Sequence, residues 1–306
     1  MPANNPLRTA NSIMTGAPDF AGDKVVLLDN GSYPGFAKYL NETWTWDGTD
    51  WTREVSVIGS GPLPIRADFA MAYDGYNVLM FGGRSESETL SDTWTFDGSA
   101  WTKEAPVTVP FGRFKSKLAF RDAAGAETAV MFGGCNMNEI LNETWIWDGD
   151  AKTWTLSAPV AKPPARIDFM FSGNTTVCVL FGGKNNTRLY GDTWTWDGTN
   201  WAQNTPTTPP TYRANAAFCF DVANSEWVMF GGSDDFNVLG DTWTLNSART
   251  AWTKEAPAAS PSSRVGATMY YDTQLGAVIL TGGTNGFSDY SYNDTWSWNG
   301  TTWAQL

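Results

Sequence analysis

Histidine is absent from this chain of 306 residues, and the absence removes several classes of chemistry. Nucleophilic sites of the Ser-His-Asp and Cys-His kinds need an imidazole base. Any acid–base catalysis would therefore use Asp, Glu, Lys or Tyr. The sequence also lacks the HExxH, P-loop, GxGxxG and CxxC patterns, so no metalloprotease, nucleotide or dithiol site is indicated.

Cysteine is scarce, with only three residues in the chain. Cys178 and Cys219 lie in apolar runs that predict strands, so we expect both thiols to be buried. Cys135 follows a glycine pair and is expected nearer the solvent. Three scattered cysteines predict no disulfide framework and favour a reducing compartment. We therefore expect a cytoplasmic protein, or a secreted or cell-surface one if the sequence is a trimmed piece of a longer chain.

Basic residues and long apolar runs are also few. The chain has 20 Lys and Arg against 32 Asp and Glu, a net charge of −12, and no basic cluster. Nucleic acid and anionic membranes are thus not expected partners. No apolar run approaches the ~18 residues of a membrane helix, and the first residues lack the apolar core of a signal peptide. Without a polar linker, we expect one monomeric domain of residues 1–306.

A short phrase recurs six times along the chain. Each copy has a carboxylate before Thr-Trp, then an aromatic residue or Leu, a turn, and a closing Trp. The six carboxylates are Glu42, Asp92, Glu143, Asp192, Asp241 and Asp294. The copies repeat with a period of about 50 residues, and repeats of about that length built from short strands are typical of β-propellers.

Two further landmarks complete each copy. An arginine follows a Pro-containing stretch at Arg8, Arg66, Arg113, Arg166, Arg213 and Arg264. An apolar run then ends in Gly-Gly, except in the first copy. We expect strand a to start at the arginine, strand b to be the apolar run, strand c to be the alternating Thr-Trp segment, and strand d to carry the last Trp. Asp-Gly or Asn-Gly predicts the turn between strands c and d in every copy but the fifth.

These landmarks resemble those of the Kelch-repeat family, whose units carry an opening Arg, a Gly-Gly after the second strand, an aromatic third strand and a Trp in the fourth. The resemblance covers roughly residues 6–306, and five of six copies keep every landmark. It implies an all-β fold, a six-bladed β-propeller of Kelch type with four antiparallel strands per blade. The expected blades are residues 6–55, 56–105, 106–157, 158–204, 205–255 and 256–306.

Some proteins with Kelch folds are enzymes, and the missing histidine separates this chain from them. Copper sites of the galactose-oxidase type, iron-dependent specifier proteins and sialic-acid mutarotases all use a histidine. The chain cannot supply that residue, so we expect neither a metal nor a cofactor.

The chain has 17 tryptophans, and all but Trp227 fall in the expected strands c and d. An aromatic residue at one position of every blade predicts packing between blades; an exposed carbohydrate platform is the alternative. Each copy supplies its own four strands. We therefore expect the ring to close by side-chain packing between the first and last blades, without an outer strand from residues 1–5.

The six arginines and the six carboxylates predict one internal ion pair per blade, because a residue present in every blade serves the blade. A ring of free arginines that binds an anion or an acidic peptide is the alternative.

Function is expected where the copies differ. Two residues after the arginine, the copies have Ala10, Asp68, Lys115, Asp168, Asn215 and Gly266. Strand a is innermost in a propeller, so these side chains should line the mouth of the central channel, with Lys115 between two carboxylates and Lys117 also facing the channel. A channel filled only with water is the alternative.

The loops between strands b and c (the b–c loops) also differ. Those of the first and last copies are rich in aromatic residues, namely Tyr33, Phe36 and Tyr39, and Phe287, Tyr290 and Tyr292. First and last blades are neighbours in a closed ring, so we expect these loops to form one binding surface. A packed aromatic cluster is the alternative.

Two functions follow from these observations. The first is a non-catalytic recognition or scaffolding propeller that binds a protein, peptide or glycan on the b–c loop face; a small-molecule ligand is also open. The second is a metal-free isomerase, cyclase or lyase with Asp68, Lys115, Asp168 and neighbouring tyrosines at the channel mouth. Strongly shifted pKa values in a closed pocket would favour the enzyme, and an open, unperturbed mouth would favour recognition.

Overall fold

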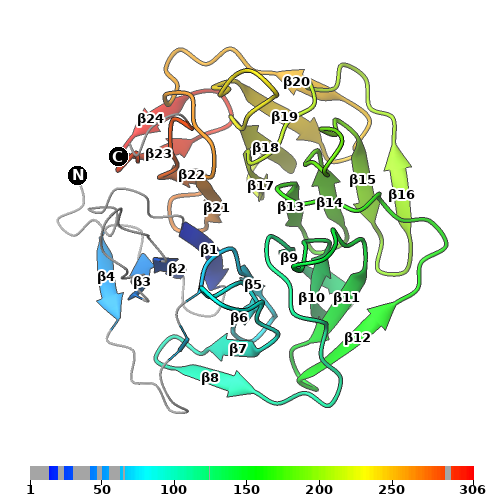
Figure 1. Ribbon diagram of the computed structural model, residues 1–306. Coiled ribbons are helices and arrows are strands. Elements are labelled where there is room, and N and C mark those ends of the chain that lie inside the picture. Colours follow the sequence, from blue (N-terminus) through cyan, green and yellow to red (C-terminus); the bar gives the residue numbers. More distant parts are fainter. Residues whose placement is uncertain are drawn as a thin grey trace.

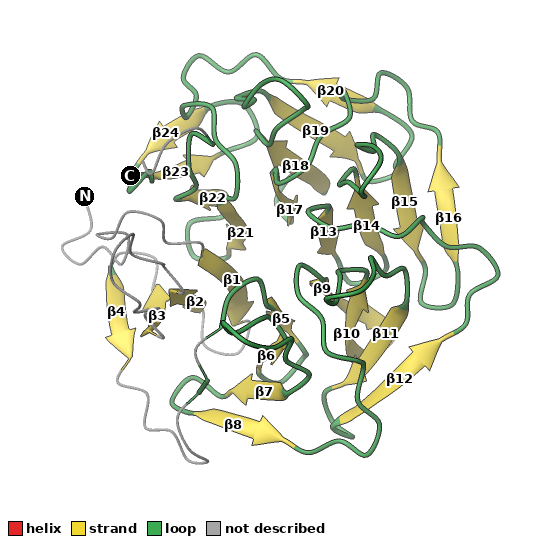
Figure 2. Ribbon diagram, in the orientation of Figure 1, coloured by secondary structure: helices red, strands yellow, loops and turns green. Residues whose placement is uncertain are grey.

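The computed structural model describes residues 14–19, 24–29, 42–46, 50–54, 63–64, 66–123, 125–286 and 291–306. These residues form four-stranded antiparallel sheets in which each strand pairs with the next strand of the sequence. The sheets are arranged around a central channel, with β5, β9, β13, β17 and β21 innermost (Figure 1). The described part contains strands and loops and no helix (Figure 2). The fold is therefore an all-β propeller of four-stranded antiparallel blades.

Five blades are described almost throughout. Blade 2 contains β5 (Ala70–Tyr73), β6 (Val78–Phe81), β7 (Thr93–Phe96) and β8 (Trp101–Glu104); blade 3 contains β9 (Lys117–Ala123), β10 (Ala126–Phe132), β11 (Thr144–Asp148) and β12 (Thr153–Ser157); blade 4 contains β13 (Met170–Gly173), β14 (Cys178–Phe181), β15 (Thr193–Trp196) and β16 (Trp201–Asn204). Blade 5 contains β17 (Ala217–Asp221), β18 (Glu226–Phe230), β19 (Thr242–Asn246) and β20 (Trp252–Lys254); blade 6 contains β21 (Thr268–Asp272), β22 (Ala277–Thr281), β23 (Thr295–Trp298) and β24 (Trp303–Gln305).

A partial blade precedes them, and we call it blade 1. It consists of β1 (Met14–Asp19), β2 (Lys24–Asp29), β3 (Glu42–Trp46) and β4 (Trp51–Glu54), described mainly in its strands. All strands fall within the blade limits expected from the repeat.

The sequence predicted that strand a starts at the arginine. In the structure it starts four residues later. β5 begins at Ala70 after Arg66, and β13 begins at Met170 after Arg166. Between the arginine and the strand, Asp68 and Asp168 have φ of 58° and 55°. This left-handed backbone is incompatible with an extended strand, so the strand begins only after it.

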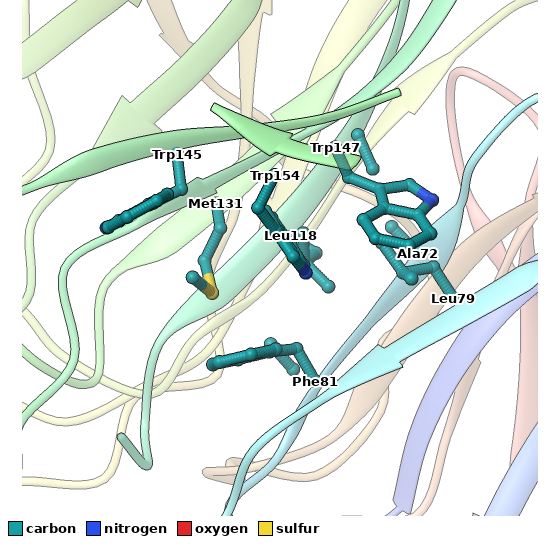
Figure 3. Packing of buried hydrophobic residues seen from close by; sticks show 10 residues of the cluster. Ala72, Leu79, Phe81, Leu118, Met131, Trp145, Trp147 and Trp154 are labelled. Carbon is teal, nitrogen blue, oxygen red and sulfur yellow. The ribbon is translucent and has the colours of Figure 1, made fainter. Parts of the chain in front are cut away.

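Large aromatic side chains fill the spaces between neighbouring blades. The closing Trp of strand d is at most 3% exposed in every blade. Between blades 2 and 3, the rings of Phe81 and Trp154 meet edge to face with centroids 5.2 Å apart, and Met131 and Leu118 lie beside them (Figure 3). The pair recurs as Phe132–Trp201, Phe181–Trp252 and Phe230–Trp303. Packing of the tryptophans between blades is thereby confirmed.

The same tryptophans are hydrogen-bonded to the preceding blade. Trp154 Nε1 donates to Thr93 Oγ1 at 2.9 Å, and Trp201 Nε1 donates to Thr144 Oγ1 at 2.8 Å. Each bond ties strand d of one blade to strand c of the blade before it, and satisfies a buried N–H that would otherwise cost about 1–3 kcal/mol. The bond recurs as Trp101–Thr43, Trp252–Thr193 and Trp303–Thr242.

The double glycine also joins neighbouring blades. Gly82 and Gly83 have φ of 66° and 94°, and the amide of Gly83 donates to the carbonyl of Arg113 in the next blade at 2.9 Å. A Cβ on Gly83 would lie 2.7 Å from the carbonyl oxygen of Ala67. Backbone conformation and space therefore both require glycine. The bond recurs as Gly134–Arg166, Gly183–Arg213 and Gly232–Arg264.

Blades 1 and 6 meet through side chains at a junction that we call the seam. Trp46 Nε1 donates to Asp272 Oδ2 at 3.0 Å, and Trp46 and Trp51 pack against Tyr270 and Ile279. Each sheet in the described part of the chain uses four consecutive strands, so none contains a strand from another blade. Side-chain contact across the seam agrees with the expected mode of closure; residues 1–5 lie outside the described residues.

The seam differs from the other junctions in one respect. Thr281 occupies the place that Phe takes before the glycine pair in blades 2–5, and its Oγ1 lies 3.1 Å from Thr295 Oγ1 in a hydrogen bond. Thr295 is the residue that the repeat assigns as acceptor for Trp51. The buried Nε1 of Trp51 has no partner among the described residues.

Candidate functional site

The opening arginine of blades 2 to 6 is held by hydrogen bonds to carbonyl oxygens and a carboxylate of its own blade. Arg166 Nη1 donates to the Gly182 carbonyl at 2.9 Å and to Asp192 Oδ1 at 2.6 Å, while Nη2 donates to Asp192 Oδ2 at 2.9 Å. Its Nε donates to the carbonyl of Pro164 at 3.0 Å. The ion pair recurs as Arg66–Asp92, Arg113–Glu143, Arg213–Asp241 and Arg264–Asp294.

These ion pairs belong to the interior of the blades. Burial alone would raise the pKa of Asp192, but the hydrogen bonds and charge of Arg166 and the indole N–H of Trp194 hold the pKa below its ordinary value. The pKa is lowered in the same way for Asp92, Glu143, Asp241 and Asp294. The five arginine side chains are at most 1% exposed, so they do not offer a ring of free cations at the surface. Arg8 and the Glu42 side chain lie outside the described residues.

The residues two positions after the arginines come together around the channel mouth. Asp68, Lys115, Asp168 and Asn215 have φ between 55° and 58°, and Gly266 has a φ of 67°. Backbone amides link them from blade to blade: Lys115 N donates to Asp68 O at 2.7 Å, Asn215 N to Asp168 O at 2.8 Å, and Gly266 N to Asn215 O at 2.9 Å. Left-handed residues therefore line the mouth, and backbone hydrogen bonds join those of blades 2 and 3, of blades 4 and 5, and of blades 5 and 6.

This backbone explains part of the variation that marked the position in the sequence. The left-handed region is most accessible to Gly, Asn and Asp, and four of the five described blades use one of these. The backbone conformation at this position is thus the same in blades 2 to 6, whereas the side chain differs from blade to blade. Ala10, the residue of the first copy, lies outside the described residues.

Ion pairs connect the charged side chains of the mouth. Lys115 Nζ lies 3.2 Å from Asp168 Oδ1, and Lys184 Nζ lies 3.2 Å from Asp168 Oδ2. Arg84 Nε lies 2.8 Å from Asp68 Oδ2, without the alignment of a hydrogen bond. Lys115 therefore pairs with one of the two carboxylates between which the sequence placed it, and Asp68 pairs with a cation of its own blade.

Below the mouth, the channel holds a cavity of about 330 Å³ lined by residues of blades 2 to 6. Lys117, the first residue of β9, faces this cavity as expected. The channel wall surrounds the side chain, although solvent reaches it, and this desolvation lowers the pKa of its amine against the opposing effect of Asp168 and Asp68. The neighbouring Ser116 is buried, and its Oγ has no hydrogen-bond partner among the described residues.

Ser116 was not identified from the sequence, whereas Lys117 was expected to face the channel, and the sequence carries a signal for it. Four residues after the arginine, the copies have Ser12, Ala70, Lys117, Met170, Ala217 and Thr268, so one copy alone has a charge there.

The b–c loops of blades 2 to 5 share one turn. The side-chain oxygen of Asn185 accepts the backbone N–H groups of Thr187 and Arg188 at 2.9 and 3.0 Å. The equivalent acceptors are Ser85, Asn136 and Asp234. This local bond fixes each loop while leaving its tip to vary. This turn was not predicted from the sequence, although a Ser, Asn or Asp recurs two residues after Gly-Gly in these four blades.

Several loop side chains on this face are exposed and apolar. Phe111 and Met137 are both 78% exposed, and Phe236 is 80% exposed. Phe111 precedes the arginine of blade 3, and the other two stand at b–c loop tips. Strand a begins and strand b ends on the same side of an antiparallel blade, so these residues share the face of the channel mouth.

Of the aromatic loop residues predicted to bind a ligand, Tyr292 is described. Its ring centroid lies 4.2 Å from the guanidinium carbon of Arg264, and its hydroxyl donates to the Ser263 carbonyl at 3.2 Å. Tyr190 covers Arg166 in the same way at 4.0 Å. Tyr292 therefore shields the buried ion pair of its blade. Tyr33, Phe36, Tyr39, Phe287 and Tyr290 lie outside the described residues.

Cysteine and metal chemistry add little to this face. Cys135 is buried rather than near solvent, because it pairs with Phe114 and Ile140 beside the mouth, and burial raises the pKa of its thiol to about 11. Cys178 and Cys219 are also buried.

No group of three metal-binding side chains occurs in the described part of the chain. None of the described residues forms a helix that could span a membrane.

Comparison with known proteins supplies one match. The family model described as the KLHDC2/KLHL20/DRC7 Kelch-repeats domain matches residues 123–305, which is more than half of the chain. No curated protein matches the chain. The matched residues include β10–β12 of blade 3 and all strands of blades 4 to 6, with the glycine pairs and closing tryptophans of these four blades and the buried arginines of blades 4 to 6. The chain therefore belongs to the Kelch-repeat β-propeller family.

Proposed function

We propose that the protein is a recognition scaffold that binds a protein or peptide segment on its b–c loop face. The observation that carries the proposal is the shared turn of the b–c loops. Four loops have the same hydrogen-bonded frame, yet their tips differ in charge and polarity. A rigid frame with variable loops is the usual arrangement of a recognition surface, because binding then costs little conformational entropy.

The chemistry of the tips suits a peptide. Met137 and Phe236 offer exposed apolar anchors, which are the side chains that contribute most when they enter a partner's pocket. Charged residues of both signs flank them, with Glu86 and Glu88 in blade 2 and Arg188 in blade 4. Complementary charges of this kind set orientation and selectivity.

The aromatic loops of blades 1 and 6 would extend the same face. We place Tyr33, Phe36, Tyr39, Phe287 and Tyr290 at its outer part on the strength of their sequence, with Asp68, Lys115, Asp168, Asn215 and Tyr292 at its inner border.

We also propose that β1–β4 completes a six-bladed ring, so that residues 1–306 form one domain. Two contacts support this: β1 lies beside β5 of blade 2 and beside β21 of blade 6.

Peptide selection tests the binding face. A random peptide library displayed on phage is selected on the immobilised protein, and the affinity of the enriched peptides is measured by titration calorimetry. Met137→Ser together with Phe236→Ser should weaken binding at least about tenfold, because anchor residues typically contribute more than about 1 kcal/mol each.

Val222→Ser together with Leu275→Ser is the matched control. These residues are also exposed but lie in turns between strands a and b, on the opposite face. Equal affinity of the loop-tip variant and the native protein would contradict the assignment of the face. Enrichment of glycans on an array, with no peptide enriched, would contradict a peptide-binding function.

A further inference from the structure

The outermost strand of blade 3 differs from its equivalents in blades 2, 4, 5 and 6. Strand d of each blade lies on the perimeter with one free edge (Figure 1). Two residues after the closing Trp, blades 2 and 5 have Lys103 and Lys254, and blades 4 and 6 have Gln203 and Gln305. Blade 3 has Leu156 there, 51% exposed. Lysine on a free edge discourages pairing with another chain, and β12 has no such residue.

The backbone groups of Trp154 and Leu156 are directed away from their sheet. In blade 5, Glu255 N donates to Thr242 O at 2.9 Å, and Ser157 has the equivalent place in blade 3. Because bonds between antiparallel strands use every second residue, Ser157 bonds β11 and Leu156 and Trp154 are directed outward. Neither residue makes a backbone hydrogen bond outside its sheet to any described residue.

Blade 5 shows how such an edge is covered elsewhere in the chain. The N–H of Trp252, the equivalent of Trp154, donates to Thr207 O at 3.1 Å, and its carbonyl accepts the hydroxyl of Thr208. Both threonines belong to the segment between blades 4 and 5. In the segment between blades 2 and 3, Val107 takes the place of Thr207, and no described residue bonds the edge of β12 in this way.

Exposed apolar side chains accompany this open edge. Val107 is 100% exposed, Val160 is 97% exposed, and Leu156 lies on the strand between them. The ion pair of Glu104 with Lys152, 3.4 Å long, places the segment of Val107 beside the start of β12. Apolar surface along an unpaired strand edge is typical of a surface that pairs with another strand.

We propose that β12 pairs antiparallel with β12 of a second copy of this chain, with the two-fold axis at Thr155. Trp154 of each copy then faces Leu156 of the other, so their outward N–H and C=O groups form four hydrogen bonds. The two Thr155 side chains meet at the axis, which is a favourable cross-strand pair. The same surface serves both copies, as a two-fold dimer requires.

The charges beside β12 favour a second copy as the partner. The exposed Asp148 and Asp150 precede the strand, and the exposed Lys162 follows it. Lys152, which lies between the acids and the strand, is already paired with Glu104. Antiparallel pairing therefore brings the acidic end of each copy to the basic end of the other, whereas parallel pairing would bring like charges together.

This surface lies on the perimeter, away from the b–c loop tips, so neither proposal depends on the other. One strand from each copy forms a small interface, and specific interfaces below about 1,200 Å² are usually weak. The monomer expected from the sequence would thus be the main form only in dilute solution.

Sedimentation equilibrium between about 1 and about 500 µM tests the dimer. The average mass should rise from 33.5 kDa towards twice that value. Leu156→Lys should weaken association at least about tenfold, because two lysines would meet the uncharged edge. Lysine is native at the equivalent positions of blades 2 and 5, so the substitution suits the fold. The control is Leu275→Lys, in an exposed turn of blade 6, which should associate like the native protein.

Disulfide trapping tests the position of the axis. Cα atoms of directly opposite residues that share no hydrogen bond lie about 4.5 Å apart, within the range of a disulfide. Under mild oxidation, Thr155→Cys should therefore form a covalent dimer at least about tenfold faster than Ala202→Cys, the equivalent exposed position of blade 4. The native Cys135, Cys178 and Cys219 are buried.

Three results would overturn the proposal. The first is an average mass that stays at one chain up to the highest concentration. The second is equal association of Leu156→Lys and the native protein, which would place the interface elsewhere. The third is equal crosslinking of Thr155→Cys and Ala202→Cys.

Discussion

At the scale of single residues, the opening arginine organises two blades at once. The guanidinium of Arg166 serves the carbonyls of its own blade and both oxygens of Asp192. Its backbone N–H donates to Leu141 O at 3.3 Å, and its carbonyl accepts the Gly134 N–H at 3.1 Å, both from the preceding blade. Lysine has no planar fork of donors, so it could not replace this arginine.

Loss of the guanidinium should therefore be costly. Arg166→Leu leaves the Asp192 carboxylate buried without its partner, and removing one member of a buried pair typically costs about 3–5 kcal/mol. We expect a fall of that size in the free energy of unfolding, measured by urea denaturation. Arg188→Met, in the exposed loop of the same blade, should cost less than about 1 kcal/mol. Similar losses for the two variants would contradict the structural role of Arg166.

Folding raises the pKa of Glu226, whereas it lowers the pKa of the carboxylates that pair with the arginines. Desolvation, followed by the carboxylates of Asp221 and Glu255, raises its pKa from the ordinary 4.5 to about 7. A carboxyl whose pKa rises on folding destabilises the protein above the folded pKa, and this penalty disappears below the unfolded pKa.

Glu226→Gln should therefore raise the free energy of unfolding at pH 8, by about 1 kcal/mol given its partial exposure, and should change little at pH 4. Urea midpoints at the two pH values measure this effect. Glu86→Gln, at an exposed loop tip, is the control and should change neither value. An equal gain for Glu226→Gln at both pH values would show that its ionisation is not the cause.

At the scale of elements, two glycines separate the cost of left-handed backbone from the cost of a steric clash. Gly183 belongs to a glycine pair, and Gly266 lies at the channel mouth. Gly183 has a φ of 87°, and a Cβ there would lie 2.6 Å from Phe169 Cβ and 2.7 Å from the Ile167 carbonyl oxygen. Gly266 has a φ of 67°, but a Cβ there would meet no atom within 4 Å. The first position combines backbone strain with collision, and the second has strain alone.

Alanine at these positions should show the difference. Gly266→Ala should cost about 1 kcal/mol, the usual penalty of left-handed backbone. Gly183→Ala should cost roughly 3 kcal/mol or more, because the segment that precedes strand a in its own blade must also move. Urea denaturation of the two variants provides the comparison. Equal losses would mean that the blade adapts to the extra methyl group.

What the sequence predicts well at this scale is local. Strands b, c and d follow from apolar runs, Thr-Trp alternation and Asp-Gly turns, which are short-range signals. Contacts between blades involve residues that are far apart in the sequence, 57 positions for Trp201 and Thr144, so no pattern within one repeat reveals them. The mouth residues were grouped correctly because topology brings them together. Their left-handed backbone was not foreseen, since side-chain variation concealed a conserved conformation.

At the scale of the whole molecule, closure of the ring depends on the contact between blades 1 and 6 at the seam. Trp46 bonds Asp272 across the seam just as Trp147 bonds Asp74 between blades 3 and 2, at 3.0 and 2.9 Å. Both aspartates also accept two turn amides through their other oxygen. The two pairs therefore have the same geometry, and the coupling energy of Trp147 and Asp74 gives the value expected for Trp46 and Asp272.

Double-mutant cycles on the two pairs measure whether the seam is closed in solution. Trp46→Phe combined with Asp272→Ala should show a coupling energy of about 1–2 kcal/mol, close to that of Trp147→Phe combined with Asp74→Ala. Chemical denaturation of the single and double variants yields both values. Coupling at Trp147 and Asp74 without coupling at Trp46 and Asp272 would mean that the ring is open at the seam.

The left-handed backbone at the channel mouth also limits which residues this surface can carry. Apolar β-branched residues are strongly disfavoured at such φ values, whereas Asn, Asp and Gly enter them at little cost. Mutation at these positions therefore samples charge, amide groups and open space, and rarely supplies a hydrophobic plug. The backbone conformation thus restricts the residue types at the channel mouth. The mouth stays polar, while its ligand preference can change without a change of backbone.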